Sequence, residues 1–269
     1  MPLVEAGRWT ISYDDVGAGP CVLLIHGLAG DHRAWRPQID SLSTLYRVIA
    51  IDNPGCGASS PVERATSMGE IAASVTLLMD KLGIARAHVI GRSMGGAIAQ
   101  EIAIRSPERV SSLTLAGSFA LLDPLGVRLI ENMRDLIKDG LTWWRWARLF
   151  SFAFVSPEWF NADPARLARL EDALGDEGRD RDSYIHLANA TLMSDTSERI
   201  RAFERPVLIL GGRHDPICSP GTIDHLASCV ARPVQVYFEH SSHFFLMEEA
   251  EAVNDHLLRW IAEHENSQP

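Results

Sequence analysis

The sequence predicts an α/β protein, in which a mostly parallel, doubly wound sheet carries helices inserted over one end. Short apolar runs such as Cys21–His26 are typical of parallel strands covered on both faces. Helical patterns alternate with these runs, which favours right-handed crossovers between parallel strands. From residue 121 to 202 the strand-like runs stop, and stretches rich in Trp and Phe follow. We therefore expect a core formed by residues 1–120 and 203–269, and a helical cap formed by residues 121–202.

The individual elements follow from local patterns along the chain. Strands are predicted over Arg8–Asp14, Cys21–His26, Tyr46–Asp52, Ala87–Ile90, Ser111–Ala116, Pro206–Gly211 and Pro233–Glu239. Ser67 and Glu70 have the spacing of a capping box, so a helix should begin there and run to about Leu82. The amphipathic stretch Glu248–His264 predicts a closing helix.

The stretch Gly91–Gly96 (GRSMGG) carries the strongest chemical signal in the chain. It contains the pattern G-x-S-x-G between a predicted strand and a helix of small residues. A sharp turn at this point forces Ser93 into a strained backbone conformation and lifts its hydroxyl above the sheet. The N-terminus of the following helix directs N–H groups toward any negative charge that develops nearby. Ser93 is therefore the candidate nucleophile.

A serine hydroxyl needs a base, usually a histidine that is itself oriented by a carboxylate. Asp215 and His243 follow two later predicted strands, so both should lie at the sheet edge that presents Ser93. His240 is a rival base, but it abuts the end of its strand. Asp123 is a rival acid after an earlier strand. We favour His243 as the base and Asp215 as the acid.

Five motifs together resemble the α/β-hydrolase fold family over essentially the full chain. They are His26-Gly27, Asp52–Ser59, Gly91–Gly95, Gly212–Asp215 and Ser242–Phe244. The resemblance implies Ser93 as nucleophile, His243 as base and Asp215 as the acid that orients it. It also implies an oxyanion hole from the backbone N–H groups of Leu28 and Met94, whose side chains should line the pocket. His26 and Asp52 are interpreted as residues that organise their own loops.

The nucleophile narrows the reaction class. Relatives that cleave carbon–halogen bonds or epoxides use a carboxylate at this position, so Ser93 argues against both. The chain most resembles small esterases, including 3-oxoadipate enol-lactonases, which implies hydrolysis of a small carboxylic ester or lactone through an acyl-serine. Three alternatives stay open: a non-catalytic or slow-turnover ligand receptor on this fold, a cofactor-free perhydrolase, and a hydrolase of C–C bonds. The last usually has a glycine-rich run after His26-Gly27, which this sequence lacks.

The aromatic residues of the predicted cap are interpreted mainly as its own core. Four of them are assigned to the substrate pocket: Trp143, Trp144, Phe150 and Phe154. A single arginine among Arg128, Arg145 and Arg148 could clamp a substrate carboxylate. Arg92, inside the elbow, has two open interpretations, a structural ion pair beneath the site or a substrate contact.

Charge and composition limit the partners. The net charge of −10 argues against nucleic acid and against an anionic membrane surface. The first residues lack the pattern of a secretory signal, and no apolar stretch is long enough to cross a bilayer, so we expect a cytoplasmic protein. The scattered cysteines and histidines show no metal-ligand spacing, so neither a metal nor another cofactor is expected. The expected partner is a small ester or lactone, and a homodimer is kept open.

Overall fold

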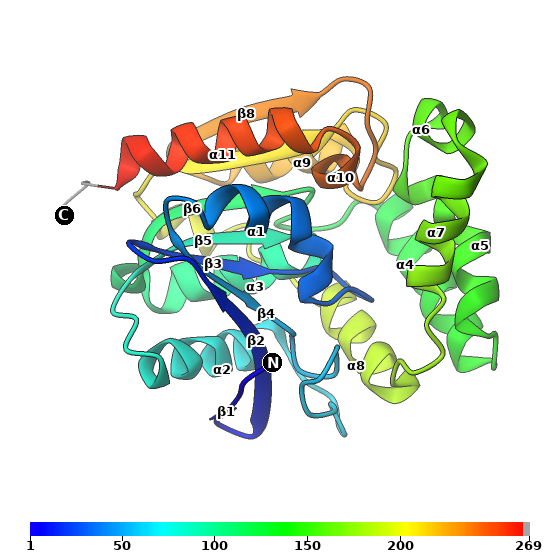
Figure 1. Ribbon diagram of the computed structural model, residues 1–269, viewed down its shortest axis with the longest axis horizontal. Coiled ribbons are helices and arrows are strands. Elements are labelled where there is room, and N and C mark those ends of the chain that lie inside the picture. The colour runs from blue at the N-terminus through cyan, green and yellow to red at the C-terminus, as the bar shows by residue number, and fades with distance from the viewer. Residues whose placement is uncertain (266–269) are drawn as a thin grey trace.

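One eight-stranded sheet organises the computed structural model, which describes residues 1–265 (Figure 1). The strands are β1 (Leu3–Ala6), β2 (Trp9–Val16), β3 (Cys21–Ile25), β4 (Arg47–Ile51), β5 (Ala87–Arg92), β6 (Val110–Ala116), β7 (Val207–Gly212) and β8 (Pro233–Phe238). They lie in the order β1-β2-β4-β3-β5-β6-β7-β8. Strands β3 to β8 run parallel, whereas β1 and β2 are antiparallel to their neighbours. The predicted mostly parallel sheet is confirmed.

The α-helices alternate with these strands in the core and follow one another in the middle of the chain. They are α1 (Arg36–Leu42), α2 (Met68–Lys81), α3 (Met94–Arg105), α4 (Pro124–Lys138), α5 (Trp143–Phe154), α6 (Pro157–Ala162), α7 (Pro164–Leu174), α8 (Arg181–Leu192), α9 (Pro220–Ser228), α10 (Phe245–Glu248) and α11 (Ala250–His264). The capping box before α2 is present, because the Ser67 and Glu70 side chains each accept a bond from the other's backbone N–H. Within residues 1–265, no helix combines the length and the apolar character needed to cross a bilayer.

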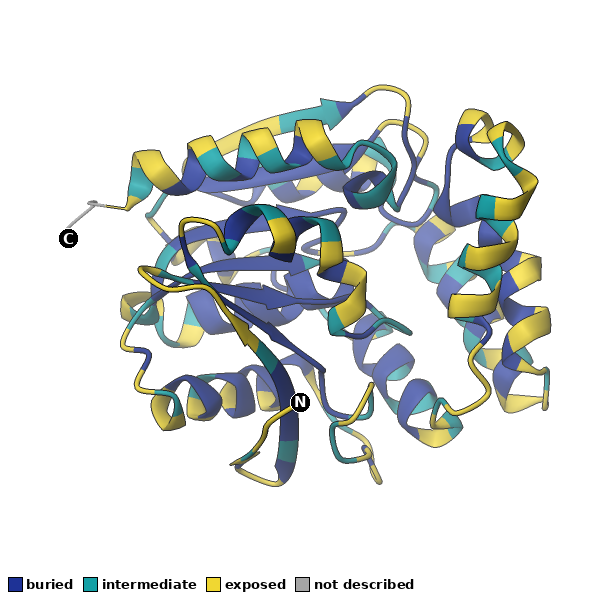
Figure 2. Cartoon of the chain, viewed as in Figure 1, coloured by how far each residue is buried: buried dark blue, intermediate teal, exposed yellow. Residues whose placement is uncertain are grey.

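Strands β3 to β7 are buried on both faces, which explains their unbroken apolar runs. In β3, Leu23 and Ile25 belong to one hydrophobic cluster, whereas Val22 and Leu24 belong to a second one. The first cluster includes the inner sides of α2 and α3, and the second includes those of α1 and α11. Figure 2 shows the buried strands between helices that are exposed only on their outer sides.

Two details differ from the sequence-based expectation. The closing helix begins two residues later than expected, because Glu249 (φ −124°, ψ 44°) lies outside the helical region and precedes α11. Strand β1 was not expected. It has four residues, of which only Ala6 is buried, so its sequence shows little apolar alternation.

Helices α4 to α8 follow one another between β6 and β7 and lie beyond the carboxyl ends of the parallel strands (Figure 1). Their interior contains the Trp146 ring, whose centroid lies 5.7 Å from those of Phe150 and Phe154. We call α4 to α8 the helical insertion. It falls within residues 121–202, and the interpretation of that range as a separate cap stays a prediction.

Candidate active site

The turn between β5 and α3 holds Ser93 in the conformation expected for an elbow. Its φ of 52° is one of two positive values among the non-glycine residues that the structure describes. Such a conformation costs roughly 1–3 kcal/mol and persists only where its surroundings hold it. The Ser93 N–H donates to the Ala116 carbonyl at 3.0 Å, and the Ser118 hydroxyl donates to the Ser93 carbonyl at 2.9 Å. The end of β6 and the residues that follow it therefore hold both backbone polar groups of the strained residue.

Two glycines of the motif allow the strands and the helix to approach this closely. A Cβ on Gly91 would lie 2.3 Å from the carbonyl oxygen of Gly95, inside any tolerable contact. A Cβ on Gly95 would lie 2.1 Å from the carbonyl oxygen of Ile25 in β3. Glycine is required at both positions because main chain packs on main chain there.

Asp215 and His243 form a buried pair at the carboxyl ends of β7 and β8. Oδ1 of Asp215 accepts backbone N–H bonds from Ile217 at 2.8 Å and Cys218 at 2.9 Å. Its Oδ2 lies 2.7 Å from Nδ1 of His243, and the two residues are only 2% and 4% exposed. Because the carboxylate is fixed from behind, it holds the imidazole with Nε2 directed away from the pair.

The two rival residues lie elsewhere. His240 is exposed to solvent. Asp123 caps α4 by accepting the Gly126 N–H at 2.8 Å, and it also accepts the Ser219 hydroxyl. The acid that contacts His243 is therefore Asp215.

Ser93 and His243 line the same cavity, but their side chains are not hydrogen-bonded to each other. Within residues 1–265 the Ser93 hydroxyl has no hydrogen-bond partner. A hydroxyl moves between staggered positions by rotation about χ1, and bonds of this kind are frequently long in a ligand-free site. The Ser93–His243 hydrogen bond stays a prediction.

His26 holds the loop after β3 against the loop after β4. The Nδ1 atom of His26 lies 2.7 Å from the Gly27 carbonyl oxygen, and its Nε2 accepts the Asn53 N–H at 2.9 Å. Burial lowers the pKa of His26, so the ring is neutral and can accept this bond. Asp52 similarly accepts backbone N–H bonds in the adjoining loops. Both residues organise loops, as interpreted from the sequence.

The two expected oxyanion donors flank Ser93. Leu28 lines the cavity, and a Cβ on the preceding Gly27 would lie 3.0 Å from the Ser93 Cβ. Met94 is the first residue of α3, where backbone N–H groups have no partner within the helix. One expectation was wrong: the Met94 side chain is fully buried in the core and does not line the cavity. The role of the two N–H groups as an oxyanion hole stays a prediction.

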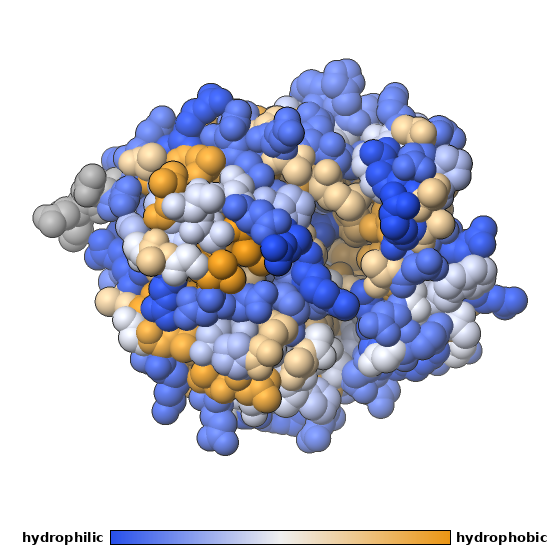
Figure 3. Space-filling model, in the orientation of Figure 1, coloured by the Kyte–Doolittle hydropathy of each residue, from blue (hydrophilic) through white to orange (hydrophobic). Residues whose placement is uncertain are grey.

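A cavity of about 410 Å³ extends from Ser93 and His243 to the helical insertion. The surface is hollowed between the core and the insertion (Figure 3). The walls that the insertion supplies are mainly apolar, and they include Ile130, Met133, Trp146, Phe154, Leu170, Leu174 and Tyr184. We call this space the Ser93 cavity. Its size and lining suit a small ligand with a substantial apolar part.

The four aromatic residues assigned to the pocket are placed differently by the structure. Only Phe154 lines the Ser93 cavity, while Trp143 lines an adjoining one. Phe150 is buried against Trp146, and Trp144 is 45% exposed and lines neither cavity. Trp144 was assigned wrongly because it sits on the outer face of α5. Trp146 was missed, although its spacing of eight residues from Phe154 places both on one helical face.

None of the three arginines suggested as a carboxylate clamp lines the Ser93 cavity, whereas Arg92, for which a substrate contact was left open, does. The suggested clamp residues are exposed and lie outside the Ser93 cavity: Arg128, Arg145 and Arg148. The cavity is lined instead by Arg33, Arg92 and Arg179, which sequence spacing gave no means of placing together. Arg33 pairs with Asp31 at 2.7 Å. Arg179 donates to two carbonyl oxygens at the end of α7, at 2.7 and 3.1 Å.

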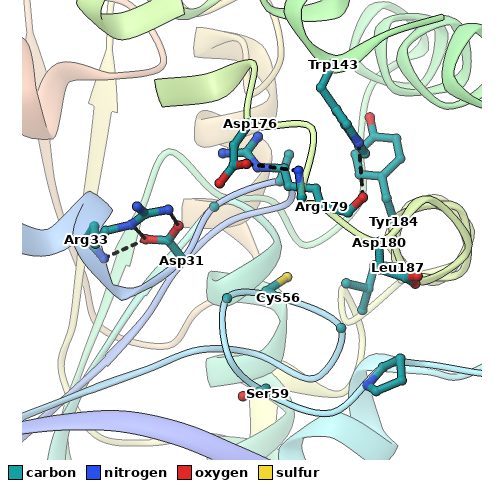
Figure 4. Close-up of a pocket in the computed structure, with 16 residues that line it drawn as sticks. Asp31, Arg33, Cys56, Ser59, Trp143, Asp176, Arg179, Asp180, Tyr184 and Leu187 are labelled. Atoms are coloured by element: carbon teal, nitrogen blue, oxygen red, sulfur yellow. Dashed lines mark hydrogen bonds and ion pairs between the residues drawn. The ribbon is translucent and has the colours of Figure 1, made fainter. Parts of the chain in front are cut away.

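A second cavity of about 340 Å³ adjoins the first and shares Asp31, Arg33, Arg179 and Tyr184 with it (Figure 4). We call it the Cys56 cavity. Figure 4 shows the Asp31–Arg33 pair and the Trp143 indole, which donates to the Arg179 carbonyl at 3.2 Å. Burial raises the pKa of the Cys56 thiol to about 12, so this cysteine is not a thiolate nucleophile.

Two clusters bring potential metal ligands within 4.8 Å of one another, namely Asp215–Cys218–His243 and Asp31–His32–Asp52. In the first, the Asp215 oxygens are engaged by N–H groups, and burial raises the pKa of the Cys218 thiol. In the second, Asp31 is paired with Arg33, and Asp52 accepts bonds from its own loops. These internal contacts account for both clusters without an ion. The expectation of no metal stays a prediction.

Comparison with known proteins agrees with this architecture. A family model described as alpha/beta hydrolase fold matches residues 20–250. The chain is 27% identical over 264 residues to a protein of Azorhizobium caulinodans named carbamate hydrolase RutD, covering 98% of this chain and 99% of that protein. It is 30% identical over 275 residues to a dihydrolipoyllysine-residue acetyltransferase component of the acetoin cleaving system of Pseudomonas putida, covering 97% of this chain and 69% of that protein.

A solved structure has the same fold. The crystal structure of the enol-lactonase from Burkholderia xenovorans LB400 superposes with a TM-score of 0.89 at 23% sequence identity, covering 97% of this chain and 100% of the other. At this level of identity the likeness concerns the fold. The sheet order, the elbow and the match to the family model over most of the chain lead to one conclusion: this chain belongs to the alpha/beta hydrolase fold family.

Proposed function

We propose that the chain is a serine hydrolase that cleaves a small carboxylic ester or lactone through an acyl-Ser93 intermediate. The observation that carries the proposal is the buried Asp215–His243 pair, 2.7 Å apart, whose histidine lines the same cavity as Ser93. A strained serine, a held imidazole and a carboxylate behind it form the set of groups that acyl transfer requires.

In this mechanism His243 acts twice. Its Nε2 takes the proton of the Ser93 hydroxyl while Oγ attacks the carbonyl carbon, and it then gives that proton to the departing alkoxide. Water attacks the acyl-serine in the second half, again with His243 as the base. Asp215 keeps Nδ1 protonated and stabilises the imidazolium that forms in each half.

The negative charge on the tetrahedral oxygen would be bound by the N–H groups of Leu28 and Met94. Each such donor typically contributes about 3 kcal/mol to the transition state. In a lactone the leaving alcohol stays attached to the acyl chain, so the whole product occupies the cavity. The volume of the cavity therefore limits the size of the substrate, but it does not select the type of acyl bond.

The names of the similar proteins support chemistry at an acyl carbon. They include a carbamate hydrolase, an acetyltransferase component and an enol-lactonase, each of which acts at a carbonyl group bonded to a heteroatom. A panel of esters, lactones, carbamates and C–C diketone substrates would identify the preferred bond. Peroxide-dependent oxidation in acetate buffer would identify a perhydrolase.

Hydrolysis of p-nitrophenyl acetate by the wild-type protein, Ser93→Ala and His243→Ala tests the proposal. We expect turnover or a burst in the wild type that both variants lose. His240→Ala is the matched control, because His240 is exposed and lies outside the cavity. Equal background rates in all four proteins would contradict the proposal and favour a ligand receptor on this fold.

A further inference from the structure

Arg92 is a partly buried cation that forms no ion pair within residues 1–265. It ends β5 and precedes Ser93, and its Nε atom is buried with no hydrogen-bond partner. Burial lowers the pKa of Arg92 to about 10, while the charge of Asp215 partly opposes that shift. The interpretation of Arg92 as a structural ion pair was therefore wrong.

Asp215 is the carboxylate with the largest electrostatic effect on Arg92, and its oxygens already bind other groups. Asp215 accepts two backbone N–H bonds through Oδ1 and contacts His243 through Oδ2. These contacts hold the carboxylate in place, and it forms no ion pair with Arg92. The other two arginines of the Ser93 cavity are also satisfied, Arg33 by Asp31 and Arg179 by backbone carbonyls. Arg92 is the exception among the three.

An aromatic stack holds the Arg92 guanidinium. Its central carbon lies 4.1 Å from the ring centroid of Phe244, whose other neighbour is Phe154, stacked at 4.9 Å with an interplanar angle of 10°. Stacking uses the face of a guanidinium and leaves the N–H groups at its edge for other partners. All three residues line the cavity with Ser93 and His243. The stack therefore orients a set of donors inside the candidate active site.

Loss of hydration around an unpaired charge is expensive, and an incoming anion would offset that cost. A guanidinium matches a carboxylate best, because two parallel N–H bonds can form. We infer that Arg92 binds a carboxylate of the substrate, so that the preferred substrate is an ester or lactone that also carries a carboxylate. The apolar part of such a substrate would lie against Phe154 and Trp146. This inference rests on the proposed hydrolysis at Ser93.

The test compares two esters of equal chain length, mono-4-nitrophenyl adipate and 4-nitrophenyl hexanoate, corrected for their uncatalysed rates. The measured quantity is the ratio of kcat/KM for the anionic ester to that for the neutral ester. Replacement of Arg92 by Met should lower this ratio about 10- to 100-fold, the range for hydrogen bonds to a charged group. A general loss of activity cancels in the ratio. Arg128→Met is the matched control, since that arginine is 73% exposed and lies outside the cavity.

A second measurement separates this inference from the proposed function. Adipate binding is measured by calorimetry in Ser93→Ala and in Ser93→Ala/Arg92→Met, with Arg92→Gln replacing the Met variant if the latter does not fold. We expect affinity to fall at least about 10-fold when Arg92 is lost. An unchanged ester ratio together with unchanged adipate affinity would overturn the inference while leaving hydrolysis intact. If loss of Arg92 weakens adipate binding but no hydrolysis depends on Ser93, Arg92 binds anions and the proposed function is wrong.

Discussion

The two adjoining cavities share part of their lining but differ in how their charged groups are satisfied. In the Cys56 cavity Asp31 pairs with Arg33, Asp176 accepts the Gly178 N–H at 2.9 Å, and Asp180 accepts the Ser183 N–H at 2.7 Å. In the Ser93 cavity Nε of Arg92 is buried without a hydrogen-bond partner, and the Ser93 hydroxyl forms no hydrogen bond with residues 1–265. Charged groups that are already paired hold a loop together, whereas groups held without partners are ready for a ligand.

The potential nucleophiles of the two cavities differ in the same way. Cys56 lies in a turn where burial raises its pKa to about 12. Ser93 is strained and shares its cavity with a fixed imidazole. A reactive side chain therefore needs a base in the same cavity, and position at the sheet edge is not sufficient.

The largest expected effects are losses of activity from substitutions in the Ser93 cavity, which substitutions in the Cys56 cavity should not cause. Ser93→Ala and His243→Ala should each lower kcat for an ester substrate by more than about 1000-fold, because each removes a group that takes part in bond formation. Cys56→Ala and His240→Ala should change kcat by less than about 2-fold. Steady-state kinetics on the four variants decides. A loss in Cys56→Ala comparable with that in Ser93→Ala would remove the distinction between the cavities.

His88 is buried and lies outside both cavities, so its titration should change the stability of the fold without changing either cavity. Burial in β5 lowers the pKa of His88 to about 4, and its Nδ1 lies 2.8 Å from the Ser112 hydroxyl oxygen. The unfolded chain takes up this proton near the ordinary value of about 6.5, whereas the folded chain resists it down to about 4. The stability that neutral His88 provides is thus complete above that ordinary value and is lost as the pH falls toward 4.

The His88 effect on the free energy of unfolding should reach about 3 kcal/mol between pH 7 and pH 4. Chemical denaturation at several pH values measures it, with His88→Gln as the variant that removes the titration. The slope should shrink in this variant but not vanish, because burial also lowers the pKa of His26. An identical pH dependence in both proteins would show that His88 carries none of it.

A smaller effect is expected in the aromatic wall of the Ser93 cavity. Phe154→Ala should lower kcat/KM about 10-fold, since it removes an apolar wall and one layer of the stack that holds Arg92. Trp144→Ala is the matched control on the same helix, because Trp144 is 45% exposed and lines neither cavity. Equal losses in the two variants would mean that α5 acts through its fold and not through this wall.

The smallest expected effect concerns the paired charges of the Cys56 cavity. The Arg33 side chain is 66% exposed, so its ion pair with Asp31 is well screened by solvent. Arg33→Met should change the free energy of unfolding by less than about 1 kcal/mol. Thermal and chemical denaturation measure the change. A loss of several kcal/mol would show that the pair is a structural element of the fold.

Local sequence patterns were sufficient for the core and for the groups at the sheet edge. Both faces of β3 to β7 are buried, so their sequences are continuous apolar runs, and the elbow requires glycine wherever main chain packs on main chain. Because β5 to β8 are parallel, the loops after β7 and β8 begin at the sheet edge that presents Ser93. Parallel strands thus place Asp215 and His243 before any tertiary detail is known.

The cavity walls could not be predicted in the same way. Trp143, Trp146 and Phe150 all lie on the inner face of α5, and the packing of α5 against α4, α7 and α8 decides which ring reaches Ser93. Whether Arg92 has a counter-ion depends on residues far apart in the chain, here Asp215 and Phe244. Such features arise from tertiary packing and leave no periodic pattern in the sequence.

Covalent labelling with diethyl p-nitrophenyl phosphate, followed by peptide mass spectrometry, tests the central claim most directly. We predict one phosphoryl group per chain, located on Ser93, absent in Ser93→Ala and formed at least about 1000-fold more slowly in His243→Ala. Labelling at another residue, or labelling at the same rate without the His243 imidazole, would contradict the account.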